Sequence, residues 1–273
     1  MSHPVVDPLP SSIPDAHRRF LISAVEALAR DPRIVGVAIG GSFLTDTMDE
    51  FSDLDLLVAT EPEGHGAVMA DRRRIAGSLG PLLAAFTGEH VGEPRLLICL
   101  YDGDPVLHVD LKFLALEDAA RRVEDPAVLW ERDGRLTRAL AEGSAEYPSP
   151  DRQWVEDRFW VWVHYVTAKI GRGEIFEALD GLSTLRAAVL GPLAQATSGA
   201  RPSGVRKLER TAPGFAERLR ETVAGYDARE CARALRACVE LYRSLSEGSN
   251  GIERRDAAEA AATDYLAEVE RRL

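Results

Sequence analysis

The pattern of hydrophobic and polar residues predicts a mixture of helices and strands in the first half of the chain. Residues 12–31 carry apolar positions at helical spacing behind a candidate N-cap at Ser12, and residues 67–86 carry a second helical pattern. Short apolar runs bounded by Gly, Pro and Asp predict strands at 34–39, 54–59, 95–101 and 106–114. The last two runs are joined by Asp102-Gly103-Asp104-Pro105, which is typical of a hairpin turn. We therefore expect an α+β fold here.

The rest of the chain is predicted to be helical. Tyr147-Pro148-Ser149-Pro150 interrupts regular structure, so we expect a domain boundary there, with domains of residues 1–147 and 148–273. The stretch 151–170 is apolar on most faces, which predicts a central helix packed on several sides. Further helices are expected at residues 175–196, 214–223, 228–245 and 253–272.

The charge distribution changes at the same boundary. Of the formal net charge of −11, residues 1–150 hold 14 Lys+Arg and 25 Asp+Glu, whereas residues 151–273 hold 19 of each. A strongly acidic half is a poor docking surface for a polyanion, so no nucleic-acid partner is expected. A cationic small molecule suits it better, although an acidic surface also serves solubility alone.

Cysteine usage and hydropathy bear on the compartment. Cys99, Cys231 and Cys238 form no C-x-x-C spacing, so neither a zinc site nor a disulfide framework is expected. Residues 1–10 lack the basic and apolar regions of an export signal, and no stretch reaches the roughly 18 apolar residues of a membrane helix. We therefore expect a soluble protein of the reducing cytoplasm with no membrane partner.

Three carboxylates are expected on one side of the predicted sheet. Because side chains alternate along a strand, Asp53 and Asp55 point to the same side of theirs. Asp110 shares a strand face with His108 and Lys112, so its carboxylate joins the first two if the strands are neighbours. Three carboxylates repel one another unless a cation lies between them, and hard oxygen ligands select Mg²⁺ or Mn²⁺. A pair of such ions is suited to phosphoryl or nucleotidyl transfer.

A diglycine motif predicts a phosphate site beside these carboxylates. Without side chains, Gly40 and Gly41 let backbone N–H groups approach phosphate oxygens, and Ser42 adds a hydroxyl donor. A phosphate cradle next to a metal site implies an NTP substrate. Each motif taken alone has a plainer interpretation, an ordinary turn for the glycines and a solvated strand face for the carboxylates.

In this order and spacing, the residues resemble the DNA polymerase beta-like nucleotidyltransferase superfamily. Gly41 and Asp53 are 12 positions apart, within the spacing usual for that superfamily. The resemblance implies a nucleotidyltransferase-type mixed sheet with flanking helices. It also implies that Gly41 and Ser42 hold the nucleotide's phosphates and that Asp53 and Asp55 bind metal. Asp110 would complete the metal site or help to deprotonate the acceptor.

The helical second half is similar to the branch of the superfamily that adenylylates aminoglycoside or lincosamide antibiotics. This resemblance implies transfer of AMP from ATP to a hydroxyl of a small molecule, with two Mg²⁺ ions and release of pyrophosphate. It also implies that residues 148–273 bind substrate or nucleotide, with a basic residue of the first C-terminal helices at the triphosphate. Lys169 is the first candidate for that residue and Arg172 the second.

Two other functions fit parts of the pattern. Minimal members of the superfamily transfer AMP to a protein such as a toxin partner, but they are usually much shorter. A non-catalytic nucleotide-binding or interaction protein would have no metal to offset the repulsion among its three carboxylates. The acceptor, the NTP used, the general base, the oligomeric state and a role in antibiotic resistance are left open by the sequence.

Overall fold

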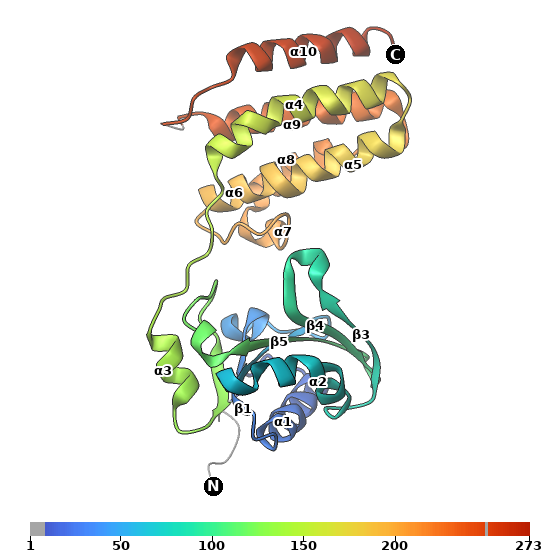
Figure 1. Cartoon of the computed structure of the whole chain (residues 1–273). Coiled ribbons are helices and arrows are strands. Elements are labelled where there is room, and N and C mark those ends of the chain that lie inside the picture. The colour runs from blue at the N-terminus through green and yellow to red at the C-terminus, as the bar shows by residue number, and fades with distance from the viewer. Residues whose placement is uncertain (1–8, 249–250) are drawn as a thin grey trace. The chain divides into compact units, whose positions relative to one another are not determined.

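The computed structural model describes residues 9–248 and 251–273. The chain divides into two compact units, Met1–Tyr147 and Pro148–Leu273 (Figure 1). The first unit combines a mixed sheet with helices, and the described part of the second is helical, so the predicted fold class is confirmed. Among the described residues, no helix is long and apolar enough to cross a membrane.

Within the described residues of the first unit, six strands form one sheet in the order β3-β4-β5-β2-β1-β6. β2 and β5 are parallel neighbours, whereas the other neighbouring strands run antiparallel. The strands are β1 (Ile34–Ile39), β2 (Leu54–Thr60), β3 (Leu82–Gly88), β4 (Glu93–Tyr101), β5 (Leu107–Ala115) and β6 (Ala127–Glu131). The parallel pair brings two segments far apart in the sequence side by side.

The two faces of this sheet are covered differently. On one face, α1 (Asp15–Ala29) and α2 (His65–Gly77) bury the apolar residues of β2 and β5 in a common core. On the other, α3 (Arg135–Ala141) packs over β1, where Leu136 lies within van der Waals reach of Gly36. The alternation of side chains turns Asp55 of β2 and the polar residues of β5 towards this second face.

The expectation of one helix over residues 67–86 is wrong in its second part. α2 ends at Gly77, and β3 then pairs antiparallel with β4 at the edge of the sheet. Gly80-Pro81 separates the two elements, because proline lacks the N–H and its ring clashes with a preceding helical turn. The sequence pattern also did not predict β6 and α3, which are short.

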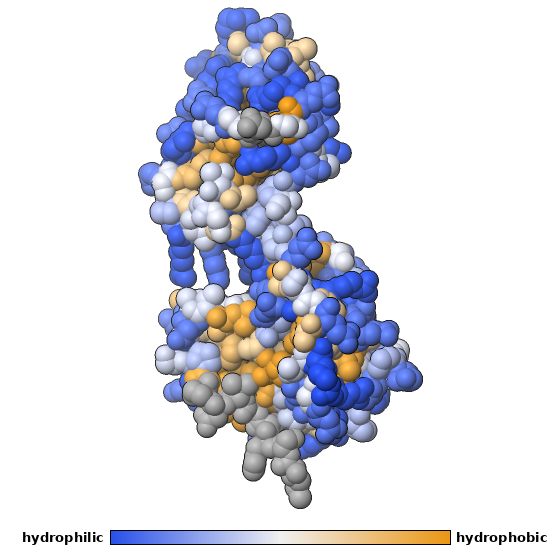
Figure 2. Space-filling model, turned by 90° about the vertical axis from the view of Figure 1, so that its left-hand side faces the viewer, coloured by the Kyte–Doolittle hydropathy of each residue, from blue (hydrophilic) through white to orange (hydrophobic). Residues whose placement is uncertain are grey.

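The second unit is a helical bundle around α4 (Arg152–Gly171), which contacts α5, α9 and α10. The expected helix over 175–196 is interrupted by a π-helical turn, Arg186–Leu190. Hydrophilic residues cover most of the surface of this unit that Figure 2 shows. The other helices are α5 (Ile175–Leu185), α6 (Gly191–Thr197), α7 (Leu208–Thr211), α8 (Pro213–Leu219), α9 (Ala228–Ser246) and α10 (Asp256–Glu270).

A buried carboxylate on α4 joins three parts of this bundle. Glu156 accepts hydrogen bonds from Trp160 Nε1 at 3.1 Å, from Tyr242 Oη at 2.5 Å and from the backbone N–H of Arg255 at 2.9 Å. Burial alone would raise the pKa of Glu156, but these donors and the nearby Arg254 guanidinium outweigh it and hold the pKa below its ordinary value. The carboxylate is therefore ionised and satisfied within the core.

Candidate active site

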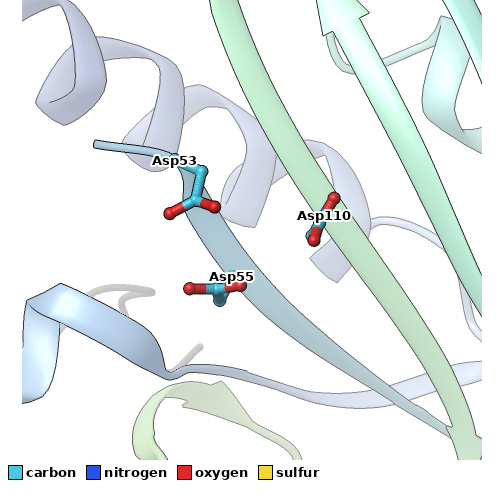
Figure 3. Close-up of side chains that lie close together, drawn as sticks. All are labelled: Asp53, Asp55 and Asp110. Carbon is cyan, nitrogen blue, oxygen red and sulfur yellow. The ribbon is translucent and has the colours of Figure 1, made fainter. Parts of the chain in front are cut away.

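The three predicted aspartates lie together on the face that α1 and α2 leave open. Asp55 on β2 and Asp110 on β5 are direct partners in the parallel register, and Asp53 immediately precedes β2. Figure 3 shows the three side chains gathered around one space. One oxygen from each carboxylate lies within 4.8 Å of those from the other two, and all three residues are partly buried.

This donor set fits a divalent metal ion. Carboxylate oxygens are the ligands that Mg²⁺ and Mn²⁺ prefer, and the side chains come from two strands whose buried residues fix their positions. Three anionic groups at this separation destabilise one another unless positive charge is supplied between them. The arrangement can therefore hold a cation against the oxygens of a bound phosphate.

The glycine motif passes closely over Asp55. Gly41 has a φ of +65°, and a Cβ there would lie 2.0 Å from Asp55 Oδ2. The N–H of Gly40 donates to the Asp55 carbonyl at 2.9 Å. Position 41 therefore requires glycine both for its left-handed backbone and for the space that the carboxylate occupies. The sequence pattern predicts that the glycines let a phosphate approach, but it does not reveal this second requirement.

Ser42 offers a hydroxyl that no group within residues 9–248 and 251–273 engages. It follows Gly41 in the 3₁₀ turn Gly41–Thr45, and its Oγ is buried with no hydrogen-bond partner among the described residues. Leaving a buried hydroxyl unsatisfied costs about 1–3 kcal/mol, which a phosphate oxygen would offset. The orphaned hydroxyl and the glycines that precede it fit a phosphate group.

Glu124 is a fourth carboxylate at the glycine motif. Its Oε1 accepts a hydrogen bond from the Gly41 N–H at 3.2 Å. A Cβ on Gly40 would lie 2.5 Å from the same oxygen. No sequence signal indicated this residue, because it lies 83 positions from Gly41 in a segment without helical or strand periodicity.

A cavity of about 850 Å³ extends from the aspartates over the open face of the sheet. Its size is within the range of small-molecule sites. Asp55, Asp110 and Glu124 line it, and the other charged lining residues are Glu93, Arg95, Lys112, Asp118, Arg121, Arg122 and Glu146.

The basic groups in this cavity have carboxylate partners close by. Glu93 pairs with Arg95 and Lys112, each at 2.8 Å, and these cations hold the pKa of Glu93 at about 2. Arg121 pairs with Asp118, and Arg122 pairs with Asp125 at 2.6 Å. The cations are therefore partly neutralised, which leaves the cavity with an acidic character.

Two histidines contact the segments that carry the aspartates. His108 Nε2 lies 3.0 Å from Asp110 Oδ1, on the same face of β5. His17 on α1 is 1% exposed, and its Nε2 lies 2.8 Å from the Ser52 carbonyl oxygen, next to Asp53. Because a carbonyl only accepts, Nε2 of His17 carries the proton. No role at the site was expected from the sequence for either histidine.

The two predicted basic residues lie in the second unit. Lys169 Nζ is 2.7 Å from Glu174 and 2.9 Å from Glu177, and these carboxylates raise the pKa of Lys169. Arg172 is mostly exposed and lies 3.8 Å from Glu174. Binding of a triphosphate by either residue stays a prediction.

Comparison with known proteins identifies the first unit. Residues 21–86 match the family described as a nucleotidyltransferase domain. The chain carries a nucleotidyltransferase domain of the DNA polymerase beta-like kind. The matched stretch contains the glycine motif, Asp53 and Asp55, and the pairing of β2 with β5 adds Asp110 from outside it. The carboxylate triad of this nucleotidyltransferase domain is of the type that holds divalent metal ions.

Solved structures give fainter likenesses, and no curated protein matches the chain. An aminoglycoside 6-adenyltransferase from Bacillus subtilis is 17% identical, with a TM-score of 0.39, 91% of this chain covered and 96% of that chain. A nucleotidyltransferase-like protein from Exiguobacterium sibiricum is 16% identical, with a TM-score of 0.34, 91% of this chain covered and 77% of that one. The nucleotidyltransferase domain is thus assigned from the family match and its own geometry.

Proposed function

We propose that this protein transfers a nucleoside monophosphate, AMP from ATP, to a hydroxyl of a small cationic molecule such as an aminoglycoside or lincosamide antibiotic, and releases pyrophosphate. One observation carries the proposal. Asp53, Asp55 and Asp110 each bring a carboxylate oxygen within 4.8 Å of the others, beside a glycine motif whose serine hydroxyl has no partner in the part of the chain that the structure describes.

The residues divide the work of the reaction between them. The Gly41 N–H and the Ser42 hydroxyl would bind the outer phosphates and aim the α-phosphorus at the open sheet face. Asp53, Asp55 and Asp110 would hold two Mg²⁺ ions. When bound, these ions supply charge that offsets the build-up on the phosphate oxygens and lower the pKa of the attacking hydroxyl.

Asp110 would act on the acceptor. It is the one member of the triad that comes from β5, on the side of the sheet where the cavity opens towards β4. His108 contacts one of its oxygens at 3.0 Å and would fix the orientation of the carboxylate. Asp110 would therefore receive the acceptor's proton or hold the ion at which the acceptor is deprotonated.

The charge of the first unit favours a cationic acceptor. Residues 1–150 hold 25 acidic against 14 basic residues, and the basic groups of the cavity are engaged by their own carboxylate neighbours. Ammonium groups gain from such a field, whereas a polyanionic acceptor would be repelled. The acidic charge of the first unit therefore supports a small amine-bearing acceptor over a nucleic acid.

Thermal shift measurements with each of the four NTPs, with and without Mg²⁺, test the donor site first. We expect the wild type to be stabilised by one nucleotide in a Mg²⁺-dependent way, since a ligand that binds only the folded state raises its stability. Asp55→Asn should keep the fold and lose both the shift and pyrophosphate release. Asp102→Asn, which changes an exposed residue outside the triad, is the matched control and should behave as wild type.

The acceptor is then identified by pyrophosphate release with a panel of aminoglycosides and lincosamides. Turnover that persists in Asp55→Asn would contradict the assignment of the active site. Nucleotide binding without turnover on any small molecule would favour transfer of AMP to a protein. Absence of any shift at millimolar nucleotide would favour a non-catalytic interaction protein.

A further inference from the structure

Glu124 accepts a hydrogen bond from a backbone N–H that, in the proposed function, binds the nucleotide. The Gly41 N–H, which would meet a phosphate oxygen, donates instead to Glu124 Oε1 at 3.2 Å. A Cβ on Gly40 would lie only 2.5 Å from the same oxygen, too close for a non-bonded contact. The carboxylate thus lies directly over the diglycine, in the space that the missing side chains open.

The segment that carries Glu124 is anchored, through Arg122, to the residues that follow α3. The guanidinium of Arg122 donates to the Gly143 carbonyl at 3.0 Å and to the Ala120 carbonyl at 3.2 Å. The backbone N–H of Glu146 donates to the Arg122 carbonyl at 2.9 Å. The backbone is therefore fixed, while the side chain of Glu124 lines the 850 Å³ cavity and has room there to rotate away.

The two donors of the glycine motif, the Ser42 hydroxyl and the Gly41 N–H, differ in their hydrogen-bond partners. The Ser42 hydroxyl has no partner among the described residues, whereas the Gly41 N–H has an anionic one. A carboxylate and a phosphate oxygen seek the same N–H, and two anions at that distance repel each other unless a cation lies between them. Both cannot occupy the Gly41 N–H at once.

We propose that Glu124 is an internal anion that competes with nucleotide phosphate for the Gly41 N–H and so sets the affinity of the site for Mg²⁺-nucleotide. The inference rests on the proposed function. Binding of a polyphosphate moves the Glu124 carboxylate from the glycine motif into the cavity. The negative charge of Glu124 repels an anion that brings no metal ion, because no cation then lies between the two. The residue therefore also selects for metal-bound polyphosphates.

Calorimetric titration with Mg²⁺·ATP, in the absence of any acceptor, tests this competition. Glu124→Gln should bind about tenfold more tightly than wild type, the size of one charge-assisted hydrogen bond, and Glu124→Ala at least as tightly. Mg²⁺·tripolyphosphate, which has no base, should show the same order. Glu146→Gln removes an equal charge from the same cavity and is the control, with less than a twofold change expected.

The contact itself is followed at the Gly41 amide in a ¹⁵N-labelled protein. Its resonance should move on Glu124→Gln without ligand, and Mg²⁺·ATP should bring both proteins to a similar position. Unchanged or weaker nucleotide binding by Glu124→Gln and Glu124→Ala would overturn the inference, and weaker binding would mean that the carboxylate braces the motif. If neither the wild type nor any variant binds Mg²⁺·ATP, the proposed function itself is wrong. If the wild type binds but the Glu124 variants bind no more tightly, only the inference about Glu124 is wrong.

Discussion

Gly41 occupies a backbone conformation and a space that no other residue suits. Its φ of +65° is costly for a residue with a Cβ, and the Asp55 carboxylate fills the position that the Cβ would take. A side chain here would push one of the triad carboxylates from its place. The residue therefore affects the position of Asp55 in the proposed metal site as well as the proposed phosphate site.

Replacing Gly41 by alanine is expected to damage both stability and metal binding. We expect Gly41→Ala to lower the free energy of unfolding by about 1–3 kcal/mol, because strain and overlap add. Its nucleotide-induced thermal shift should disappear. Gly66→Ala is the control, because a Cβ there meets nothing within 4 Å in α2, and it should stabilise the protein by up to about 1 kcal/mol. Denaturant titration measures both effects.

Repulsion among the three carboxylates is expected to lower the stability of the metal-free protein. Asp55 and Asp110 are register partners with their carboxylates on one face, so neutralising one relieves repulsion in the metal-free protein. We expect Asp110→Asn to raise the melting temperature without Mg²⁺ by roughly 1–4 °C, as for a gain of up to about 1 kcal/mol. Mg²⁺ should stabilise the wild type more than this variant. A lower melting temperature of Asp110→Asn in EDTA would contradict the prediction.

At the residue scale, what the sequence reveals depends on how far apart the partners lie. Alternation along the strands predicts that Asp53, Asp55 and Asp110 share one face, and the folded chain brings them together. Glu124 and His17 gave no signal, because their contacts depend on tertiary packing across many positions. The catalytic and binding roles of all these residues stay predictions.

At the element scale, α1 does more than cover the sheet. It places His17, which is buried, against the carbonyl of Ser52 and so fixes the chain just before Asp53. The helix α1, which was predicted from its apolar face, therefore also provides a polar contact to the segment before Asp53. The contact lies on the side of the sheet opposite to the cavity, which is why periodicity alone gave the histidine no role.

His17 is expected to position Asp53 and not only to stabilise the core. We expect His17→Leu to raise the Mg²⁺ concentration needed for half-maximal activity several-fold, because the segment before Asp53 loses its anchor. His17→Gln keeps an N–H donor and should restore most of the Mg²⁺ response. If both variants shift the melting temperature alike but leave the Mg²⁺ requirement unchanged, the histidine serves packing alone.

The error at β3 has a physical cause. An edge strand pairs on one side only and exposes much of its surface, so Leu82–Gly88 lacks both the continuous apolar run of β1 and the alternation of β2 and β5. Residues such as alanine also favour a helix by intrinsic propensity. The pairing with β4 decides the outcome, and a pattern within the segment does not contain that information.

At the scale of the whole molecule, ionised carboxylates in both units link stability to pH. The pKa of Glu93 in the first unit is about 2, and that of Glu156 in the second is also below its ordinary value. A depressed pKa in the folded state gives stability above the ordinary value of 4.5 that is lost as the pH falls towards the folded value. Both units should therefore weaken in acid.

Glu93→Gln tests this linkage in the first unit. At neutral pH the variant should be less stable by about 1–2 kcal/mol, because Arg95 and Lys112 lose a shared anionic partner. The difference from wild type should shrink as the pH falls from 4.5 towards about 2. Denaturant melts over this range measure it, and a difference independent of pH would exclude the linkage.

The sequence predicted the fold class of each half better than the individual helices and strands within it. The change in charge and the Tyr147-Pro148 break predict a boundary between the halves, and the assignment of residues 148–273 as a substrate-binding domain stays a prediction. Short elements such as β6 and α3 hold few residues, so they carry too little periodicity to be recognised. They are nevertheless needed to complete the sheet and its second face.

The parallel ladder of β2 and β5 bears on how this protein can evolve. Because the register sets Asp55 beside Asp110, inserting one residue into β5 would turn the aspartate to the opposite face and abolish the site. The connection between β5 and β6, by contrast, lines the cavity without belonging to the ladder. Insertions and deletions there can reshape the cavity without shifting the register of Asp55 and Asp110, so, under the proposed function, a change of acceptor is expected to arise most readily through residues 116–126.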